Sequence, residues 1–316
     1  MTAVTPSAPP RLRRGYTLGI VAPAGPIKLD RLERGLARLG NAFALRMAPS
    51  LGAPRTADTP SYLAADDDMR VAEFNAMLAD PDVRGILLAR GGYGLMRILP
   101  RLDADALRRD PKPIIGFSDG TALLAWAYAN GVRGVHGPMG VQLGSLSDAD
   151  VAYLIELVTE ARAPHVRPWG LVAHGAGERR GPLVTGNLTM LSLLVGTPWP
   201  MPLDGALALI EEVGERPYEI DRYMTQLILT GQLARTAALI VGDLTRCEDA
   251  NPPTGEPDPP DAAVRVVLER ARSVGLSVAV GAPIGHGDRN EAVPFGAQAI
   301  LDLDLGTLEI IEPAVA

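Results

Sequence analysis

The chain has 316 residues, of which 47% are hydrophobic and 21% charged, as in a globular protein with room for two domains. Its formal net charge of -7 argues against nucleic acid as a partner, because a phosphate backbone needs a basic surface, and against an anionic membrane surface. The single cysteine, Cys247, excludes an internal disulfide and a metal site built from several cysteines.

The N-terminal residues are Thr, Ser, Ala and Pro followed by arginines, and no apolar segment comes after them. This pattern is not that of a signal peptide. No stretch of the sequence has the length and apolarity of a membrane-spanning helix. We therefore expect a cytoplasmic protein with a short N-terminal tail.

The first part of the chain alternates between apolar strands and helices. Leu32, Leu36 and Leu39 recur at helical spacing and predict one face of a helix over 29–39. Apolar strands that alternate with helices indicate a parallel sheet covered on both faces, with ligand sites at the carboxyl ends of its strands. The other predicted helices cover 66–79 and 121–130, and the strands cover 17–26 with its closing turn, 43–47, 85–89, 113–117 and 134–138.

The chain then changes in composition. Residues 161–182 are richer in Pro, Gly, His and Arg, lose their periodicity and are expected to form a linker. The fold class is therefore α/β, with an N-terminal doubly wound domain over 1–160 and a smaller C-terminal α/β domain over 183–316. In the second domain we expect helices at 187–195, 220–229 and 262–274, and strands at 206–213, 237–241, 277–285, 297–303 and 307–311.

The segment GFSDG interrupts two apolar runs with a serine between glycines. Gly116, Ser118 and Gly120 fit the pattern G-x-S-x-G, with a strand before it and a helix after it. Small neighbours allow a serine on a sharp, strained turn to keep its hydroxyl open to a substrate. The N–H of Asp119 would then point into the same space as an oxyanion donor. The alternative is an ordinary strand-to-helix turn with Ser118 as the N-cap.

The segment ARGGYG, one strand-helix unit earlier, should end at the same edge of the sheet. It has no lysine and no G-x-G-x-x-G pattern, so it is a poor phosphate loop. Its glycines would let backbone N–H groups approach a ligand, so Gly91 or Gly92 is a candidate second oxyanion donor. Gly91 and Tyr93 are also candidate substrate contacts.

A nucleophilic serine needs a base, and the chain has four histidines. His165 and His174 fall in the expected linker and should be exposed to solvent. His136 shares a domain with Ser118 and remains a rival. We favour His286, because it follows an apolar strand and is bracketed by two glycines, a position that presents its ring to something outside the strand.

The third member of such a site is a carboxylate that orients the histidine. Glu211 and Glu212 end an apolar strand, where two carboxylates are costly unless one has a partner and the other faces solvent. Strand alternation sends them to opposite faces but does not tell which one faces the histidine. The alternative is an acidic strand end paired with Arg216 or Arg222. The order serine, glutamate, histidine is known among serine hydrolases.

Seven segments, taken together and in order, resemble the LD-carboxypeptidases. These are serine peptidases of the muramoyl-tetrapeptide carboxypeptidase type, related to microcin C self-immunity peptidases. The resemblance extends from about residue 17 to residue 313. It is carried by YLAADDDMR, LLARGGYGLMRILPRLD, IIGFSDGTALL, VHGPM, TGNLTMLSLLVGTPW, LALIEEVGERPYEIDRYMTQL and GAPIGHGDRNEAVPFGAQAILD.

The resemblance implies a triad and an oxyanion hole. Ser118 matches the nucleophile, His286 the histidine of the G-H-G segment, and Glu211, the first of the acidic pair, the carboxylate. Backbone amides of Asp119 and of the glycine pair that includes Gly92 match the oxyanion donors. The triad is assembled from both domains of the family's fold.

The resemblance also implies an activity. The family hydrolyses the bond between the L-centre of a diamino acid and a terminal D-alanine in murein tetrapeptides. It does so in the cytoplasm, during cell-wall recycling, without a metal or other cofactor, and as homodimers. The acidic, proline-rich segment 248–260 departs from the family pattern, and it bears on the substrate preference more than on the chemistry.

Other functions stay open. One is an immunity-type peptidase or amidase acting on a peptidyl-nucleotide, which would need an aromatic platform near the site, whereas only 4% of the residues are aromatic and none clusters near His286. Another is a nucleotide-binding module without hydrolytic activity. A carboxypeptidase must also bind a free carboxylate, and Arg90 and Arg222 are candidates for this, each with a structural ion pair as the alternative.

Overall fold

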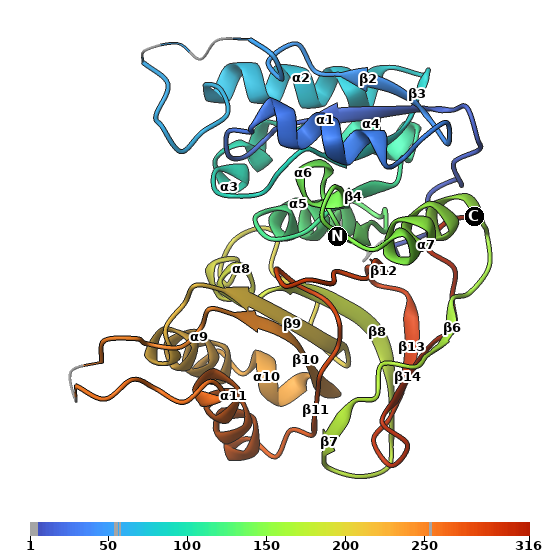
Figure 1. The fold of residues 1–316 in the computed structure, drawn as a ribbon. Coiled ribbons are helices and arrows are strands. Elements are labelled where there is room, and N and C mark those ends of the chain that lie inside the picture. Colours follow the sequence, from blue (N-terminus) through green and yellow to red (C-terminus); the bar gives the residue numbers. More distant parts are fainter. Residues whose placement is uncertain (1–5, 54–55, 57, 253–254) are drawn as a thin grey trace. The chain divides into compact units, whose positions relative to one another are not determined.

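The computed structural model describes residues 6–53, 56, 58–252 and 255–316 (Figure 1). The chain divides into two compact units. Unit 1 takes Met1–Arg162, Glu291–Gly296 and Pro313–Ala316, and unit 2 takes Ala163–Asn290 and Ala297–Glu312. In the described residues, no helix has the length and the apolar character needed to cross a membrane.

Unit 1 is built on a sheet that, in the described residues, has six strands in the order β12-β5-β4-β3-β1-β2. Strands β1 to β5 run parallel, and β12 is antiparallel to β5 at one edge. The chain leaves β1 for β2 on one side and later enters β3 on the other, so the turns after β1 and β3 flank a topological switch point. The strands are β1 (Thr17–Val21), β2 (Ala44–Met47), β3 (Val83–Leu88), β4 (Ile114–Gly116), β5 (Val135–His136) and β12 (Val293–Pro294).

Helices cover this sheet and bury its apolar strands. Residues 85–88 of β3 are fully buried, as expected for a parallel strand with both faces covered. Helix α2 begins where the Asp66 carboxylate accepts a hydrogen bond from the Met69 N–H at 2.7 Å. The helices are α1 (Leu29–Ala37), α2 (Asp67–Ala79), α3 (Leu95–Ile98), α4 (Ala104–Arg109), α5 (Gly120–Ala129), α6 (Gly140–Leu143) and α7 (Asp148–Thr159), with a 3-10 turn η1 (Leu99–Arg101).

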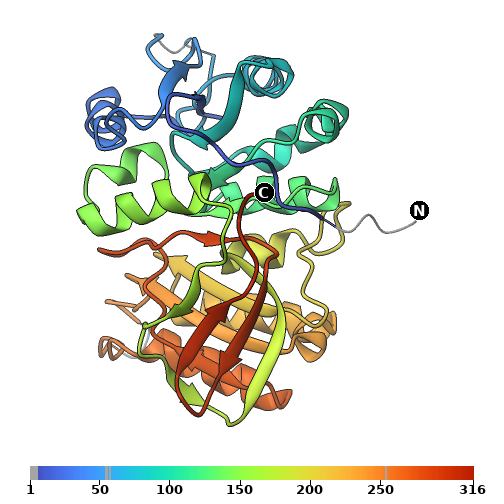
Figure 2. The same ribbon diagram turned by 90° about the vertical axis from the view of Figure 1, so that its right-hand side faces the viewer.

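Unit 2 holds a mixed sheet, which the described residues form with eight strands in the order β6-β14-β13-β8-β9-β10-β11-β7. Its centre, from β8 to β11, is parallel. Figure 2 shows β13 and β14 beside the long strand β8. The strands are β6 (His165–Arg167), β7 (Val172–His174), β8 (Glu178–Asn187), β9 (Leu207–Val213), β10 (Ala238–Thr245), β11 (Val278–Val280), β13 (Gln298–Asp302) and β14 (Thr307–Ile310).

The helices of unit 2 follow the parallel strands. Helix α9 starts with Pro217 at its first position, where the missing N–H leaves no donor unsatisfied. The helices are α8 (Leu188–Leu193), α9 (Pro217–Leu229), α10 (Gln232–Arg235) and α11 (Ala262–Ser273). The α/β class with a parallel core is thus the one that the sequence predicted.

Several elements differ from the sequence prediction. Residues 161–182, which we expected to form a linker, carry β6, β7 and the first half of β8. Strand β10 continues beyond the predicted end at Val241, because its last residues pair with the end of β9. Strand β11 ends at Val280 rather than at residue 285, since Gly281 turns the chain with φ 108° and Pro283 follows. The residues after β11 are therefore a loop, and this loop carries His286.

Candidate active site

Ser118 follows β4 on a strained turn. Its φ of 59° lies in the left-handed region, which L-residues other than glycine rarely adopt. The side chain is half-buried, and α5 begins two residues later with Asp119, not Ser118, in the N-cap position. A positive φ at the serine fits a nucleophile elbow, whereas the N-cap position of Asp119 contradicts the alternative of Ser118 as the cap.

The two glycines around Ser118 are fixed by packing against β3. A Cβ at Gly116 would lie 2.6 Å from Cδ1 of Leu88, and one at Gly120 would lie 2.9 Å from the same atom. Both distances are far below normal carbon–carbon contact. The spacing G-x-S-x-G therefore lets the elbow sit directly on the buried Leu88 side chain.

The turn after β3 approaches Ser118 closely. A Cβ at Gly91 would lie 2.9 Å from Cβ and 3.0 Å from Oγ of Ser118, so only glycine fits there. Gly92 has φ 111°, which also requires glycine. In the part of the chain that the structure describes, neither Gly92 nor Asp119 uses its N–H in a backbone hydrogen bond. Two backbone donors are therefore available, one on the residue after the serine and one on the residue after Gly91, which packs against the serine, as an oxyanion hole requires.

The Asp119 carboxylate, by contrast, has a structural partner. It is buried and accepts a hydrogen bond from the Leu95 N–H at 2.9 Å, which ties the elbow to the start of α3. Burial raises the pKa of Asp119 to about 6, while the hydrogen bond from Leu95 and the charge of Arg70 oppose the rise. The Asp119 side chain therefore joins the turn after β4 to the turn after β3, while the backbone N–H of Asp119 takes no part in this contact.

Arg70 adds further hydrogen bonds between the turns of unit 1. Its guanidinium is fully buried and donates to the carbonyl of Gly94, at 3.0 Å, and to that of Pro23. The Gly25 N–H donates to the carbonyl of Gly91 at 3.0 Å. The turns after β1, β3 and β4 are thus linked by hydrogen bonds at the carboxyl edge of the unit 1 sheet.

In unit 2, the end of β9 presents a carboxylate to a histidine. Glu211 is fully buried, and its Oε2 lies 2.6 Å from Nδ1 of His286. Its Oε1 has no hydrogen-bond partner among the described residues. A buried carboxylate on Nδ1 fixes the imidazole tautomer and leaves Nε2 as the proton acceptor, since Nδ1 then carries the hydrogen.

The glycines that bracket His286 are required by its neighbours. A Cβ at Gly285 would lie 2.8 Å from Cβ of Asp243, and one at Gly287 would lie 2.4 Å from Oδ2 of Asp243. The Gly287 N–H donates to the same Asp243 oxygen at 3.1 Å, and Asn290 Oδ1 accepts from the Gly285 N–H at 3.1 Å. Asp243 and Asn290 thereby shape the histidine loop, and the sequence had not indicated either residue.

The pKa of His286 reflects two opposing effects. Burial lowers the pKa of the imidazole, but the hydrogen bond and the negative charge of Glu211 raise it more, with a further rise from Glu212. The positive charge of Arg246 acts against this rise. The net pKa lies above the usual value of 6.5. The ring is therefore a stronger base than a free histidine.

Glu212 lies on the other face of β9, as strand alternation predicted. Its oxygens accept from Asn187 Nδ2 at 2.7 Å and from the N–H and hydroxyl of Thr189, both at 2.8 Å. Burial raises the pKa of this carboxyl. The question that alternation left open is answered by geometry, because Glu211 and not Glu212 bonds His286. The alternative pairing with Arg216 does not occur, since Arg216 pairs with Glu219 at 2.8 Å.

The other histidines have different surroundings. His136 is fully buried in β5, with its ring centroid 5.8 Å from that of Phe117 in an edge-to-face contact, so it belongs to the core of unit 1. His165 and His174 are exposed on β6 and β7, as predicted. Burial raises the pKa of Cys247 to about 12, so this thiol stays protonated and unreactive.

Three further candidates have defined contacts. Arg90 donates to the carbonyl of Pro26, and the Arg222 guanidinium lies 5.3 Å from the centre of the Tyr218 ring. Tyr93 is half exposed and packs edge-to-face against Tyr62, with ring centroids 5.6 Å apart. This exposed aromatic pair was not expected, because Tyr62 lies in a segment without periodicity.

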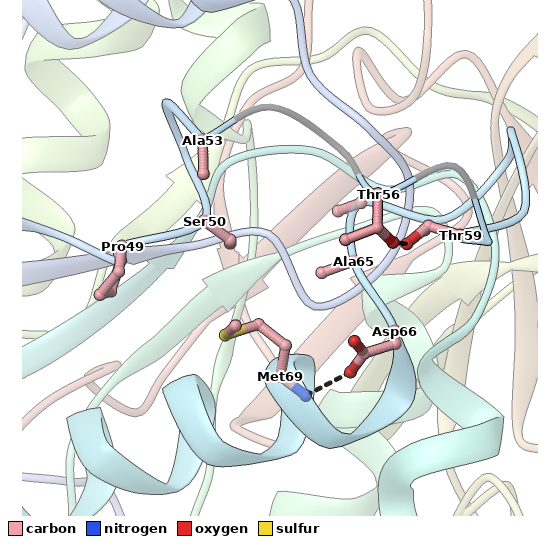
Figure 3. Close-up of a pocket in the computed structure, with 9 residues that line it drawn as sticks. Pro49, Ser50, Ala53, Thr56, Thr59, Ala65, Asp66 and Met69 are labelled. Carbon is pink, nitrogen blue, oxygen red and sulfur yellow. Dashed lines mark hydrogen bonds between the residues drawn. The ribbon is translucent and has the colours of Figure 1, made fainter.

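A pocket of about 140 Å³ lies after β2, next to the start of α2 (Figure 3). Its carboxylate, Asp66, is occupied as the cap of α2, and the hydroxyls of Thr56 and Thr59 lie 2.6 Å apart. Among the described residues, the lining holds no histidine, cysteine or basic side chain, so its serine and threonine hydroxyls have no histidine to act as their base. It consists of Pro49, Ser50, Ala53, Thr56, Thr59, Ala64, Ala65, Asp66 and Met69. Over the described ranges of the chain, no group of three or more His, Cys, Asp or Glu side chains could hold a metal ion.

Known proteins resemble this chain in sequence and in fold. A Bacillus subtilis protein named "Probable murein peptide carboxypeptidase" is 31% identical, over 93% of this chain and 91% of its own. The structure of a muramoyltetrapeptide carboxypeptidase from Oxalobacter formigenes superposes with a TM-score of 0.80 and 25% identity, over 94% of this chain and 99% of that one. The microcin C7 self-immunity protein MccF, in complex with aspartyl sulfamoyl adenosine, gives a TM-score of 0.86 at 24% identity, over 98% and 100%.

Family assignments cover both units. Residues 18–137 match the LD-carboxypeptidase N-terminal domain, and residues 180–301 match the LD-carboxypeptidase C-terminal domain. The first match contains the serine elbow, and the second contains Glu211 and His286. The chain therefore belongs to the LD-carboxypeptidase family of peptidases.

Proposed function

We propose that this protein is a serine carboxypeptidase that hydrolyses the L,D-peptide bond to a C-terminal D-alanine in cytoplasmic murein tetrapeptides, during cell-wall recycling. The observation that carries the proposal is the 2.6 Å contact between Glu211 Oε2 and His286 Nδ1, because it prepares Nε2 to accept a proton. The strained, half-buried Ser118 between two obligatory glycines supports the choice of nucleophile. The names of the murein-directed relatives support the substrate class.

In the proposed mechanism, His286 takes the hydroxyl proton of Ser118, and Oγ attacks the carbonyl that precedes the terminal D-alanine. The N–H groups of Asp119 and Gly92 stabilise the tetrahedral oxyanion, each by about 2.7–4 kcal/mol. His286 then gives the proton to the leaving amine, so that D-alanine departs and an acyl-enzyme remains on Ser118. Water, deprotonated by His286, hydrolyses this ester. Every step uses groups of the chain, and none requires a metal or cofactor.

Substitution of the nucleophile tests the proposal. Ser118→Ala removes the attacking oxygen, and we expect release of D-alanine from a murein tetrapeptide to fall by about 10⁴-fold or more. Ser145→Ala, which removes an exposed hydroxyl bonded only to the Gln142 carbonyl, is the matched control and should release D-alanine at the wild-type rate. A Ser118→Ala variant that folds and retains turnover would contradict the assignment.

A second candidate function has one observation in its favour. The exposed pair Tyr62 and Tyr93 lies on and near the turn that carries Gly92, and aromatic rings of this kind can support a nucleobase. An immunity-type peptidase would therefore cleave an aminoacyl sulfamoyl nucleoside with a higher kcat/KM than a murein tetrapeptide, and Tyr62→Ala would lower that value. The proposed function predicts the opposite order of the two substrates.

The remaining alternative is a nucleotide-binding module without hydrolysis. Such a module would be stabilised by nucleotide in a thermal unfolding experiment and would release no D-alanine. We also propose a homodimer, on the family resemblance alone. Light scattering tests it, because a dimer has twice the chain mass of 33.4 kDa.

A further inference from the structure

The turn directly after β10 holds an arginine in a strained backbone conformation. Arg246 has φ 56°, in the left-handed region that arginine rarely adopts. Its neighbours are fixed, because Thr245 pairs with Val213 of β9, the Thr245 carbonyl accepts from the Gly214 N–H at 2.9 Å, and Cys247 is buried. Strain of this kind persists only where the surroundings impose it, and it is concentrated at functional sites.

The Arg246 guanidinium has no direct partner among the described residues. The side chain is exposed, and within the described residues it makes no ion pair and no hydrogen bond. Arg216, at the start of α9, pairs with Glu219, and Arg235, the last residue of α10 before β10, pairs with Asp204. Arg246 is thus a cation without an ion-pair partner among the described residues. The backbone conformation, and not a side-chain contact, fixes where it lies.

Arg246 lies at the same edge of the sheet as the histidine and its carboxylate. Strands β9 and β10 are parallel neighbours, with Glu212 opposite Leu244, so Arg246 follows two residues beyond the level of the acidic pair. Its charge is close enough to His286 to lower the pKa of the imidazole in part. A positive group therefore stands within electrostatic range of the base.

A carboxypeptidase must bind the free carboxylate of its substrate close to the leaving amine. The histidine must reach the amine of the departing amino acid, and in an amino acid the amine nitrogen and the carboxyl carbon are only two bonds, about 2.5 Å, apart. The group that binds the free carboxylate therefore belongs near His286. Arg90 is engaged with a carbonyl in the other unit, and Arg222 lies on the Tyr218 ring.

We propose that Arg246 binds the C-terminal carboxylate of the substrate and thereby selects peptides with a free C-terminus. The planar guanidinium can donate two parallel hydrogen bonds to a carboxylate, which a point charge cannot do with the same geometry. This inference rests on the proposed function and adds the residue that would make the enzyme a carboxypeptidase rather than an endopeptidase.

Arg246→Gly tests the inference without loss of the fold, because glycine adopts a positive φ freely. We expect its melting temperature to equal or exceed that of the wild type. On a murein tetrapeptide with a free carboxylate, kcat/KM should fall by about 10- to 100-fold, chiefly through KM. On the same tetrapeptide with a C-terminal amide, wild type and variant should be equally slow. Arg246→Lys should recover part of the loss, and Arg235→Ala, in α10 before β10, should match the wild type.

The outcomes separate the inference from the proposed function. If the wild type releases D-alanine and Arg246→Gly does so with unchanged KM, or loses activity equally on the acid and the amide, the role of Arg246 is wrong and the proposed function stands. If the wild type releases no D-alanine from either peptide, the proposed function is wrong and the inference falls with it.

Discussion

Close packing permits only glycine at the two positions that flank Ser118 in the G-x-S-x-G segment. The Leu88 side chain occupies the space where a Cβ of Gly116 or Gly120 would be, and Ser118 takes the strained conformation between them. The glycines therefore serve packing as much as chemistry. Their spacing is visible in the sequence, whereas the buried leucine that requires it is not.

Gly116→Ala should destabilise unit 1 by about 1–3 kcal/mol, because the added methyl group would lie 2.6 Å from Leu88 Cδ1 and force the core to move. Urea unfolding monitored by circular dichroism measures this change. Gly52→Ala is the matched control, since a Cβ at Gly52 meets no atom within 4 Å, and its stability should stay within about 0.5 kcal/mol of the wild type. Equal stability of the two variants would contradict the packing argument.

The histidine should give activity a defined pH dependence. His286 must be neutral to accept a proton, and Glu211 raises its pKa above 6.5, so kcat/KM should rise with pH through a pKa above that value. In Glu211→Gln the charge is lost and burial dominates, so the rise should move to lower pH. The plateau should fall by about 10³- to 10⁴-fold. A rise that stays at the same pH in Glu211→Gln would show that another group titrates.

Most of the candidate site residues could be predicted from the sequence. The glycine brackets of Ser118 and His286 predicted presentation of both side chains, and the physical reason for each bracket is now apparent. The choice between Glu211 and Glu212 was not accessible from the residues themselves, because it depends on Asn187 and Thr189, distant in sequence, which bind Glu212. Arg246 was missed because the strand before it was expected to end at Val241.

At the scale of elements, hydrogen bonds join the turns of unit 1 into one platform. Asp119 connects the elbow to α3, and Arg70 connects α2 to the turns after β1 and β3. Rigid support of this kind would hold the proposed oxyanion donors in place before the reaction, which is the condition for their effect.

The buried carboxylate in this platform predicts a pH effect on stability. The pKa of Asp119 is about 6 in the folded chain, above its ordinary value of 3.8, so wild-type stability should fall as pH rises through this window. Asn at this position keeps the acceptor for the Leu95 N–H but does not titrate. The stability of Asp119→Asn relative to the wild type should therefore increase by about 2 kcal/mol between pH 4 and pH 7. If the difference in unfolding free energy between Asp119→Asn and the wild type, measured by urea unfolding, stays the same across this pH range, the raised pKa of Asp119 is contradicted.

The sequence predicted the elements that depend on local residue patterns and missed those that depend on partners far along the chain. The buried parallel strands and the helices between them follow from local apolar patterns. Strand β8 does not, because its polar first half pairs antiparallel with β13 and its apolar second half pairs parallel with β9, with Pro182 opposite Gln298 where the pairing changes. Those partners lie far along the chain, so composition alone predicted a linker there.

At the scale of the whole molecule, the proposed triad draws on both units. Ser118 belongs to unit 1, and Glu211 and His286 belong to unit 2. The chain passes from the histidine loop directly into unit 1, where β12 pairs with β5 and places Val293 opposite His136. The N-terminal family match lies within unit 1, and the C-terminal match lies in unit 2 except for Glu291–Gly296, which belong to unit 1.

The central claim is that His286, held by Glu211, activates Ser118 of the other unit. Mass spectrometry after treatment with a fluorophosphonate measures this directly, because the reagent reacts with activated serines. We predict a single adduct on Ser118 in the wild type and labelling that is at least about 100-fold slower in His286→Ala. Adduct on another residue, or labelling of Ser118 at the same rate in His286→Ala, would contradict the account.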